Sequence, residues 1–179
     1  SANPKGPERR ALPEADAEAR QVAATLSRAN FQVAETAGSW LEVMAALTRP
    51  VQILHMVGHG QWAPEEQEGT GFVASDGQVI ARAHLRSLKR APPALVFLNT
   101  CHLGRLDENR SAFAADLAGF LISEVGVQVV IAAGWAVQDS AAVAFAQTLY
   151  QRLTGGSPLR VAVGSARAAA LAASPGGAT

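Results

Sequence analysis

The sequence predicts an α/β fold, a three-layer α-β-α sandwich built around a mainly parallel sheet. The chain has 179 residues, of which 49% are hydrophobic, enough for one domain with a sizeable core. Near-continuous apolar runs at 51–57, 94–98 and 127–133 end at turn residues, which is typical of parallel strands covered on both faces. Helical patterns alternate with these runs and imply βαβ units.

The first elements are predicted from local signals. A proline followed by acidic residues predicts a helix over 13–28, because proline suits the first turn and carboxylates stabilise its positive end. Alternation of apolar and polar residues predicts a short strand at 31–35. Ser39 and Glu42 form a Ser-x-x-Glu capping box, which predicts a second helix ending near Pro50.

The later elements surround and follow the apolar runs. An Asp-Gly turn at Asp76 and Gly77, flanked by strand-like residues, predicts a small β-hairpin within 71–82, interpreted as an insertion and not as a core strand. Gly126 and Gly155 are predicted to end helices. The four helical patterns cover residues 83–90, 111–125, 140–153 and 158–172.

Composition excludes several classes of partner and site. Fifteen Lys and Arg residues balance fifteen Asp and Glu residues, so no basic field attracts nucleic acid or an anionic membrane. The longest apolar stretch, 129–137, is far shorter than the roughly 18 residues of a transmembrane helix. A single cysteine excludes an internal disulfide and a zinc ribbon and favours a reducing, cytoplasmic setting. We expect no metal and no cofactor.

The predicted organisation is one domain over residues 12–173, with flexible tails at 1–11 and 174–179. The opening segment contains proline, glycine and charges but no apolar core of a signal peptide, which favours a fragment of a longer protein. The last 60 residues hold five charged side chains. This part is therefore expected to be core or an interface that other parts of a longer protein cover.

Reacting groups in open α/β sheets gather beyond the carboxyl ends of the strands. His59 and Cys101 each follow one of the apolar runs, so they are expected to meet at that edge. A thiol needs a neighbouring imidazole to take its proton or stabilise its thiolate, and His59 is the candidate partner for Cys101. Gly60 allows close backbone approach, so the N–H groups of Gly60 and Cys101 are candidate oxyanion donors.

Structural roles compete with these catalytic ones. A lone cysteine is often a small buried hydrophobe, and a lone histidine is often a hydrogen-bonded structural residue. Flanking glycines and placement at strand ends favour catalysis. His55, inside the apolar run, is interpreted as a packing histidine. A metal pair of His55 and His59 is not expected, because residues four apart share a face on a helix and not on a strand entering a turn.

Three further residues are candidates for substrate binding. Asp139 follows the third apolar run and either caps the next helix or presents a carboxylate to a substrate Arg or Lys. Arg is the preferred partner because its planar fork binds a carboxylate through two hydrogen bonds. Trp135 either lines the same slot or belongs to the core, and Asp76 is an alternative carboxylate.

These motifs together resemble the CHAT family, a caspase-like domain often found beside tetratricopeptide repeats and grouped with caspases, gingipains and separase. The resemblance rests on His59-Gly60 after a buried strand, the Asp76-Gly77 hairpin, the segment 98–104 around the single cysteine, and the segment 135–139 before a helix. It implies a caspase-hemoglobinase fold. It also implies His59 as general base and acid, Cys101 as nucleophile, and an oxyanion hole formed by the N–H groups of Gly60 and Cys101.

The leading functional hypothesis is a thiol-dependent endopeptidase that cleaves proteins or peptides. Its regulators would be a partner or neighbouring domains of a longer parent protein, such as tetratricopeptide repeats. The alternative is a catalytically silent caspase-fold module that binds peptides or partner proteins. A third hypothesis is a non-proteolytic α/β enzyme with a reactive thiol.

Overall fold

A computed structural model describes residues 13–35, 38–61, 63, 65–102, 108–132 and 139–174. The chain divides into two compact units, which are described separately. The first unit comprises Ser1–Leu12 and Thr36–Ala136, and the second comprises Pro13–Glu35 and Val137–Thr179. The predicted boundaries of a single domain at 12–173 and the three-layer arrangement therefore remain predictions.

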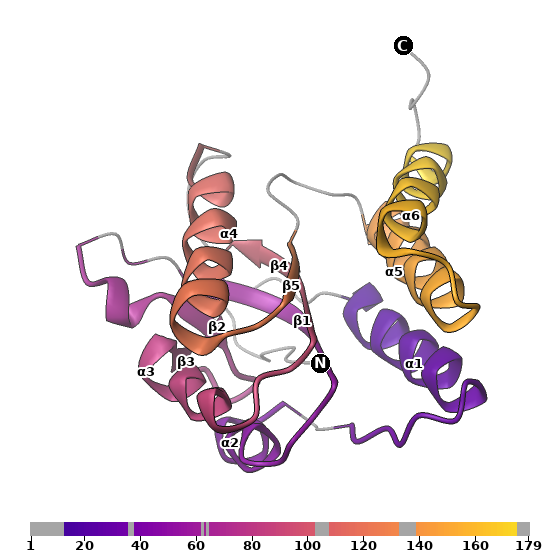
Figure 1. Ribbon diagram of the computed structural model, residues 1–179. Helices are drawn as coiled ribbons and strands as arrows, with labels where there is room; N and C mark the ends of the chain where they lie inside the picture. The colour runs from indigo at the N-terminus through magenta and orange to yellow at the C-terminus, as the bar shows by residue number, and fades with distance from the viewer. Residues whose placement is uncertain are drawn as a thin grey trace. The chain divides into compact units, whose positions relative to one another are not determined.

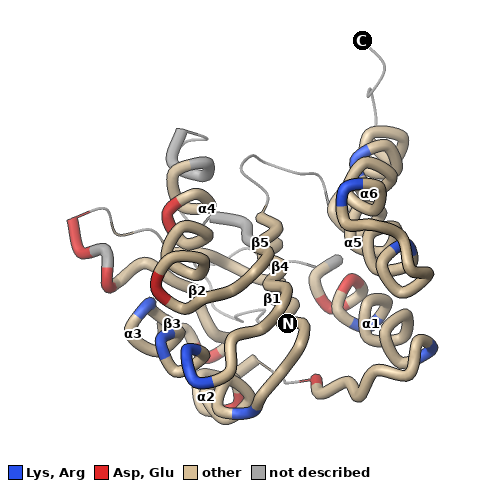
Figure 2. The backbone as a smooth tube through the Cα atoms, in the orientation of Figure 1, with Lys and Arg blue, Asp and Glu red and all other residues tan. Residues whose placement is uncertain are grey.

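The first unit is built on a five-stranded sheet of order β3-β2-β1-β4-β5 (Figure 1). Three strands run parallel, in the order β1, β4 and β5, and carry no Lys, Arg, Asp or Glu (Figure 2). The mixed α/β class and the three apolar strands are thus confirmed. The strands are β1 Ile53–Gln61, β2 Gly71–Val73, β3 Val79–Ala81, β4 Leu95–His102 and β5 Val129–Ala132.

The hairpin of β2 and β3 belongs to the sheet, so its interpretation as an insertion outside the core is wrong. Strand β2 pairs antiparallel with the carboxyl end of β1, from His59 opposite Val73 to Gln61 opposite Gly71. The side chains of Phe72, Val73 and Ile80 are each 1% exposed. The β2 residues Phe72 and Val73 are apolar on both faces of the pleat, which suits a strand with a covered sheet position.

Helices cover one face of this sheet and form the main hydrophobic core with it. Helix α2 begins with the predicted capping box, in which Ser39 and Glu42 bond each other's backbone N–H. Gly126, with φ 92°, ends the last helical segment in the left-handed conformation, as predicted. The segments are α2 Trp40–Leu47, η1 Gln67–Gly69, α3 Arg82–Leu85, η2 Arg86–Arg90, α4 Glu108–Phe120 and the π-helical turn η3 Leu121–Val125.

Burial of the parallel strands is uneven. Val96 and Leu98, on the strand between β1 and β5, are at most 1% exposed, as predicted. Four other side chains of these apolar runs, which were predicted to be covered on both faces, are only partly buried: Leu54, Met56, Val129 and Ile131. Strand β5 is an edge of the sheet, and β2 covers only the last three residues of β1. A central strand is shielded by a neighbouring strand on each side. The partly buried positions of β1 and β5 have a neighbouring strand on one side.

The second unit contains three helices, in which α1 and α6 both pack against α5. They are α1 Pro13–Arg28, α5 Asp139–Thr154 and α6 Leu159–Ala173, close to the predicted bounds. Helix α5 ends before Gly155 as predicted, although Gly156 is the residue with a left-handed φ of 81°. The predicted strand at 31–35 is wrong: these residues are exposed and form no strand. In the described part of the chain, no helix is long and apolar enough to cross a membrane.

Candidate active site

His59 lies near the carboxyl end of β1 and is buried, with 2% of its surface exposed. Strands β1 and β4 are parallel, and their register pairs His59 directly with Cys101. Neighbouring strands are separated by about 4.8 Å. The two residues that the sequence selected 42 positions apart are therefore side by side in the sheet.

His59 and Cys101 lie inside strands. The sequence predicted that they would lie in the turns that follow those strands. The predicted strands ended at residues 57 and 98, whereas β1 extends to Gln61 and β4 to His102. Gly58 and Gly60 indicated a turn, yet both pair with β4. The side chain of Cys101 is outside the described part of the structure, so the register is a statement about its backbone.

Gly60 has a second structural role that the sequence did not predict. A Cβ atom at Gly60 would lie 2.7 Å from Cζ and 2.9 Å from Cε1 of Phe113 in α4. Such contacts are shorter than carbon atoms tolerate, so the ring packs directly against the glycine backbone. Phe113 itself is 2% exposed. The only sequence signal for this residue was an aromatic side chain in a predicted helix.

His59 is on the opposite face of β1 from the Gly60–Phe113 contact, because successive side chains of a strand alternate. His55 is four residues earlier and on the same face, and its ring stacks on that of Phe97 with the centroids 4.6 Å apart. This geometry supports the packing role predicted for His55. Among the described residues, no group of three or more His, Cys, Asp or Glu side chains is placed to hold a metal ion.

Asp76 is held in the hairpin turn by hydrogen bonds from two backbone N–H groups. Its Oδ2 accepts the Trp40 N–H at 2.9 Å and its Oδ1 accepts the Gln78 N–H at 3.1 Å. The pKa of Asp76 is lowered, chiefly by the bond from Trp40. Because β2 runs antiparallel from Gln61 back past His59, the turn that follows it lies toward the amino-terminal half of β1.

The two other substrate-binding candidates remain predictions. Trp135 lies outside the described residues. Asp139 is the first residue of α5, in the second unit, and its side chain is also outside the described part. Its position at a helix start is compatible with capping and does not exclude binding of substrate.

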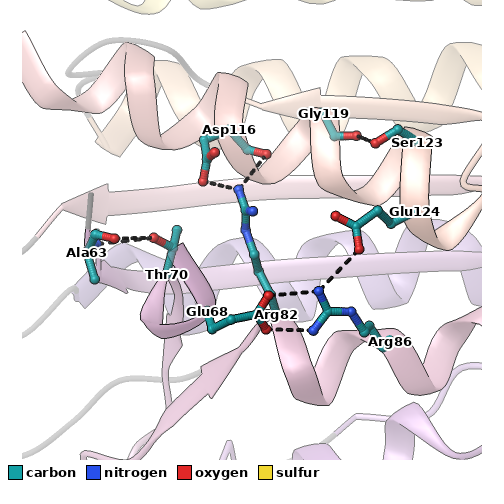
Figure 3. A network of polar contacts seen from close by, with 9 residues as sticks. All are labelled: Ala63, Glu68, Thr70, Arg82, Arg86, Asp116, Gly119, Ser123 and Glu124. Carbon is teal, nitrogen blue, oxygen red and sulfur yellow. Dashed lines mark hydrogen bonds and ion pairs between the residues drawn. The ribbon is translucent and has the colours of Figure 1, made fainter. Parts of the chain in front are cut away.

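A network of ion pairs involves the segment between β1 and β2 (Figure 3). The sequence did not predict this network. Arg86 donates to both carboxylate oxygens of Glu68, at 2.6 and 2.8 Å, and to Glu124 at 3.2 Å. The hydrogen bond from Arg86 lowers the pKa of Glu68. Arg82 pairs with the Asp116 carboxylate. The Arg86 contacts join η2 to η1 and η3, and the Arg82–Asp116 pair joins α3 to α4.

The ring of Phe120 lies close to both arginines of this network. The guanidinium carbons of Arg82 and Arg86 are 5.1 and 5.4 Å from the centroid of its ring. Such distances allow cation–π attraction. The signal in the sequence is an Arg-x-x-x-Arg spacing, which places both side chains on one side of a helical segment.

No curated protein matches the chain. The model of one family, the CHAT domain, matches residues 1–176. Because that match spans essentially the whole chain, the protein belongs to the CHAT domain family, a family of caspase-like, peptidase-type domains.

Proposed function

We propose that this CHAT domain is a cysteine endopeptidase in which Cys101 is the nucleophile and His59 is the general base and acid. The observation that carries the proposal is the register of β1 and β4, which pairs the backbones of these two residues. Register partners on neighbouring strands share a face of the sheet. His59 is buried and Cys101 is the only cysteine of the chain, so their backbone pairing supports a thiol activated by a neighbouring imidazole.

The reaction uses the two residues in alternation. His59 takes the proton of the Cys101 thiol, and the thiolate attacks the carbonyl carbon of the scissile peptide bond. The tetrahedral intermediate collapses when the imidazolium gives its proton to the leaving amine, which departs as the C–N bond breaks. A water molecule, deprotonated by His59, then attacks the thioester and releases the acid product and the thiol.

The oxyanion would be held by the backbone N–H groups of Gly60 and Cys101. Gly60 pairs with Phe72 on one side and His102 on the other, so its backbone is part of the sheet. Donation to a substrate oxygen requires local release of this pairing at the end of β1. We therefore include in the proposal an activating change supplied by a partner or a neighbouring domain.

The same pairing favours a second candidate function, a silent caspase-fold module that binds peptides without cleaving them. If the end of β1 never opens, the N–H of Gly60 is not offered to a substrate. A silent module needs no coupling between His59 and the thiol. The reactivity of Cys101 therefore separates the two functions.

The test measures alkylation of Cys101 by iodoacetamide between pH 5 and 9 in the wild type, His59→Ala and His55→Ala. Wild-type Cys101 should form its thiolate well below the ordinary thiol pKa of about 8.5, because a neighbouring imidazolium stabilises it. In His59→Ala the profile should move up toward about 8.5. His55→Ala, on the same strand and face, is the matched control and should keep the wild-type profile.

An identical profile in the wild type and His59→Ala would contradict the dyad. Peptidase assays complete the test, since Cys101→Ala and His59→Ala should each abolish cleavage while the protein stays folded. Residues that act as a unit lose their function together. Cleavage by Cys101→Ala at the wild-type rate would assign the activity to a contaminant.

A further inference from the structure

Phe113 contacts the backbone one residue beyond His59. Its ring fills the place of the missing side chain at Gly60, where a Cβ would approach three ring atoms to between 2.7 and 3.3 Å. The ring is therefore in contact with the main chain of β1 itself. Its neighbour His59 has its side chain on the other face of the same strand.

The same ring belongs to the segment that follows Cys101. Phe113 lies in α4, the first helix after β4, and is part of the buried core beneath the sheet. Gly60 pairs with His102, the residue directly after Cys101. The ring thus packs where the strand of the histidine and the strand of the cysteine end next to each other.

We propose that Phe113 is a positioning residue that fixes the β1 backbone at His59 relative to β4 and thereby sets the distance between the imidazole and the Cys101 thiol. This inference rests on the proposed dyad. The contact that carries the inference is the one between the ring and the backbone of Gly60, through which Phe113 would act. A close-packed core transmits such a contact because its side chains have little room to relax.

The experiment compares Gly60→Ala, Phe113→Leu and the double variant, with Phe120→Leu as the matched control. Phe120 is on the same helix and in the same core, at 3% exposed, but its ring faces Arg82 and Arg86. Two quantities are measured for each variant: the pH profile of Cys101 alkylation by iodoacetamide, and the urea midpoint of unfolding.

Gly60→Ala should move the pH profile toward that of His59→Ala and slow alkylation at pH 7 about tenfold or more, since a displacement of about 1 Å can cost 100-fold. Phe113→Leu alone should cause a smaller change of the same sign. The double variant should recover much of the wild-type profile, because the smaller leucine makes room for the added Cβ. Phe120→Leu should lower the urea midpoint and leave the profile unchanged.

The inference is overturned if Gly60→Ala and Phe113→Leu both keep the wild-type profile while His59→Ala does not. It is also overturned if Phe120→Leu shifts the profile as much as Phe113→Leu does, because Phe113 would then be an ordinary core residue. If His59→Ala itself has no effect, the proposed dyad fails and this inference fails with it. Phe113→Leu decides the question if Gly60→Ala does not fold.

Discussion

A carboxylate near a helix start can bind backbone N–H groups or a cationic ligand, and the two aspartates considered for substrate binding illustrate the difference. Asp76 already accepts the N–H of Trp40, at the start of α2, and the N–H of Gln78. Its oxygens therefore hold the hairpin turn against that helix. Asp139 is the first residue of α5, so the same two roles are open to it: binding of backbone N–H groups or of a cationic substrate.

Substitution of Asp139 by asparagine separates its two possible roles. Asparagine caps helices as well as aspartate does, so a capping role predicts no change in activity or stability. A slot for Arg or Lys loses a charge-assisted hydrogen bond of about 1.5–3 kcal/mol, which is about 10- to 100-fold in kcat/KM. The measurement is a peptide library cleaved by the wild type, Asp139→Asn and Asp76→Asn.

Loss of cleavage after Arg or Lys in Asp139→Asn alone would assign Asp139 to the substrate slot. Asp76→Asn should retain the wild-type preference, because Asp76 lies toward the amino-terminal half of β1. Absence of cleavage after Arg or Lys in the wild type, or its full survival in Asp139→Asn, would make Asp139 a cap.

The His59–Cys101 pair could be predicted because parallel strands bring their carboxyl ends to one edge. The residues at which these strands end could not be predicted. Glycine indicates a turn from sequence alone, but Gly60 is a glycine because Phe113 occupies the space of its side chain. That reason depends on a residue 53 positions away, and only the folded chain brings the two together.

At the scale of elements, two short segments with similar sequence signals have different outcomes. Phe72 and Val73 form a strand because the end of β1 offers a free edge to pair with. Residues 31–35 alternate apolar and polar side chains, yet they form no strand. A strand exists only with a partner, and local periodicity does not say whether one is near. Helix signals such as the Ser39 capping box were reliable because both partners are local.

The ion pairs between helices should differ in their effect on stability according to burial. The Arg82 side chain is 8% exposed and its partner Asp116 is 27% exposed, whereas Arg86 and Glu68 are 42% and 58% exposed. Asp116→Ala leaves a buried guanidinium without its carboxylate and should lower the free energy of unfolding by about 1–3 kcal/mol. Glu68→Ala should lower it much less, because exposed pairs are screened by solvent.

Urea unfolding of the two variants and of Asp116→Asn checks this order. The asparagine keeps one acceptor oxygen for Arg82 and should lose less stability than the alanine. Addition of salt should weaken the effect of Glu68→Ala and leave that of Asp116→Ala nearly unchanged. Equal losses in Asp116→Ala and Glu68→Ala would mean that burial does not govern this network.

At the scale of the whole molecule, the sequence predicts one domain, whereas the structure has two compact units. The second unit contains helices of 16, 16 and 15 residues, a small amount of material for an independent core. Its helix α6 also leaves Leu171 60% exposed. The prediction of a single domain over residues 12–173 requires cooperative unfolding of the whole chain, which is measurable.

The tryptophans and the single tyrosine of the chain allow this prediction to be tested with one probe for each unit. All three tryptophans, at 40, 62 and 135, fall within the first unit, and the single tyrosine, Tyr150, is in the second. Tyr150 is fully buried, and burial raises the pKa of its hydroxyl above the ordinary value of 10.0. Tryptophan fluorescence therefore follows unfolding of the first unit, and the ¹⁹F signal of fluorotyrosine at Tyr150 follows that of the second.

For a single cooperative domain, the two probes should give the same urea midpoint and the same slope. A cavity in the first unit should then move both transitions together. Leu98→Ala, at a side chain 1% exposed in β4, should lower the stability seen by both probes by about 2–5 kcal/mol. If the tyrosine signal keeps its midpoint while the tryptophan signal shifts, the two units unfold independently and the chain contains two domains.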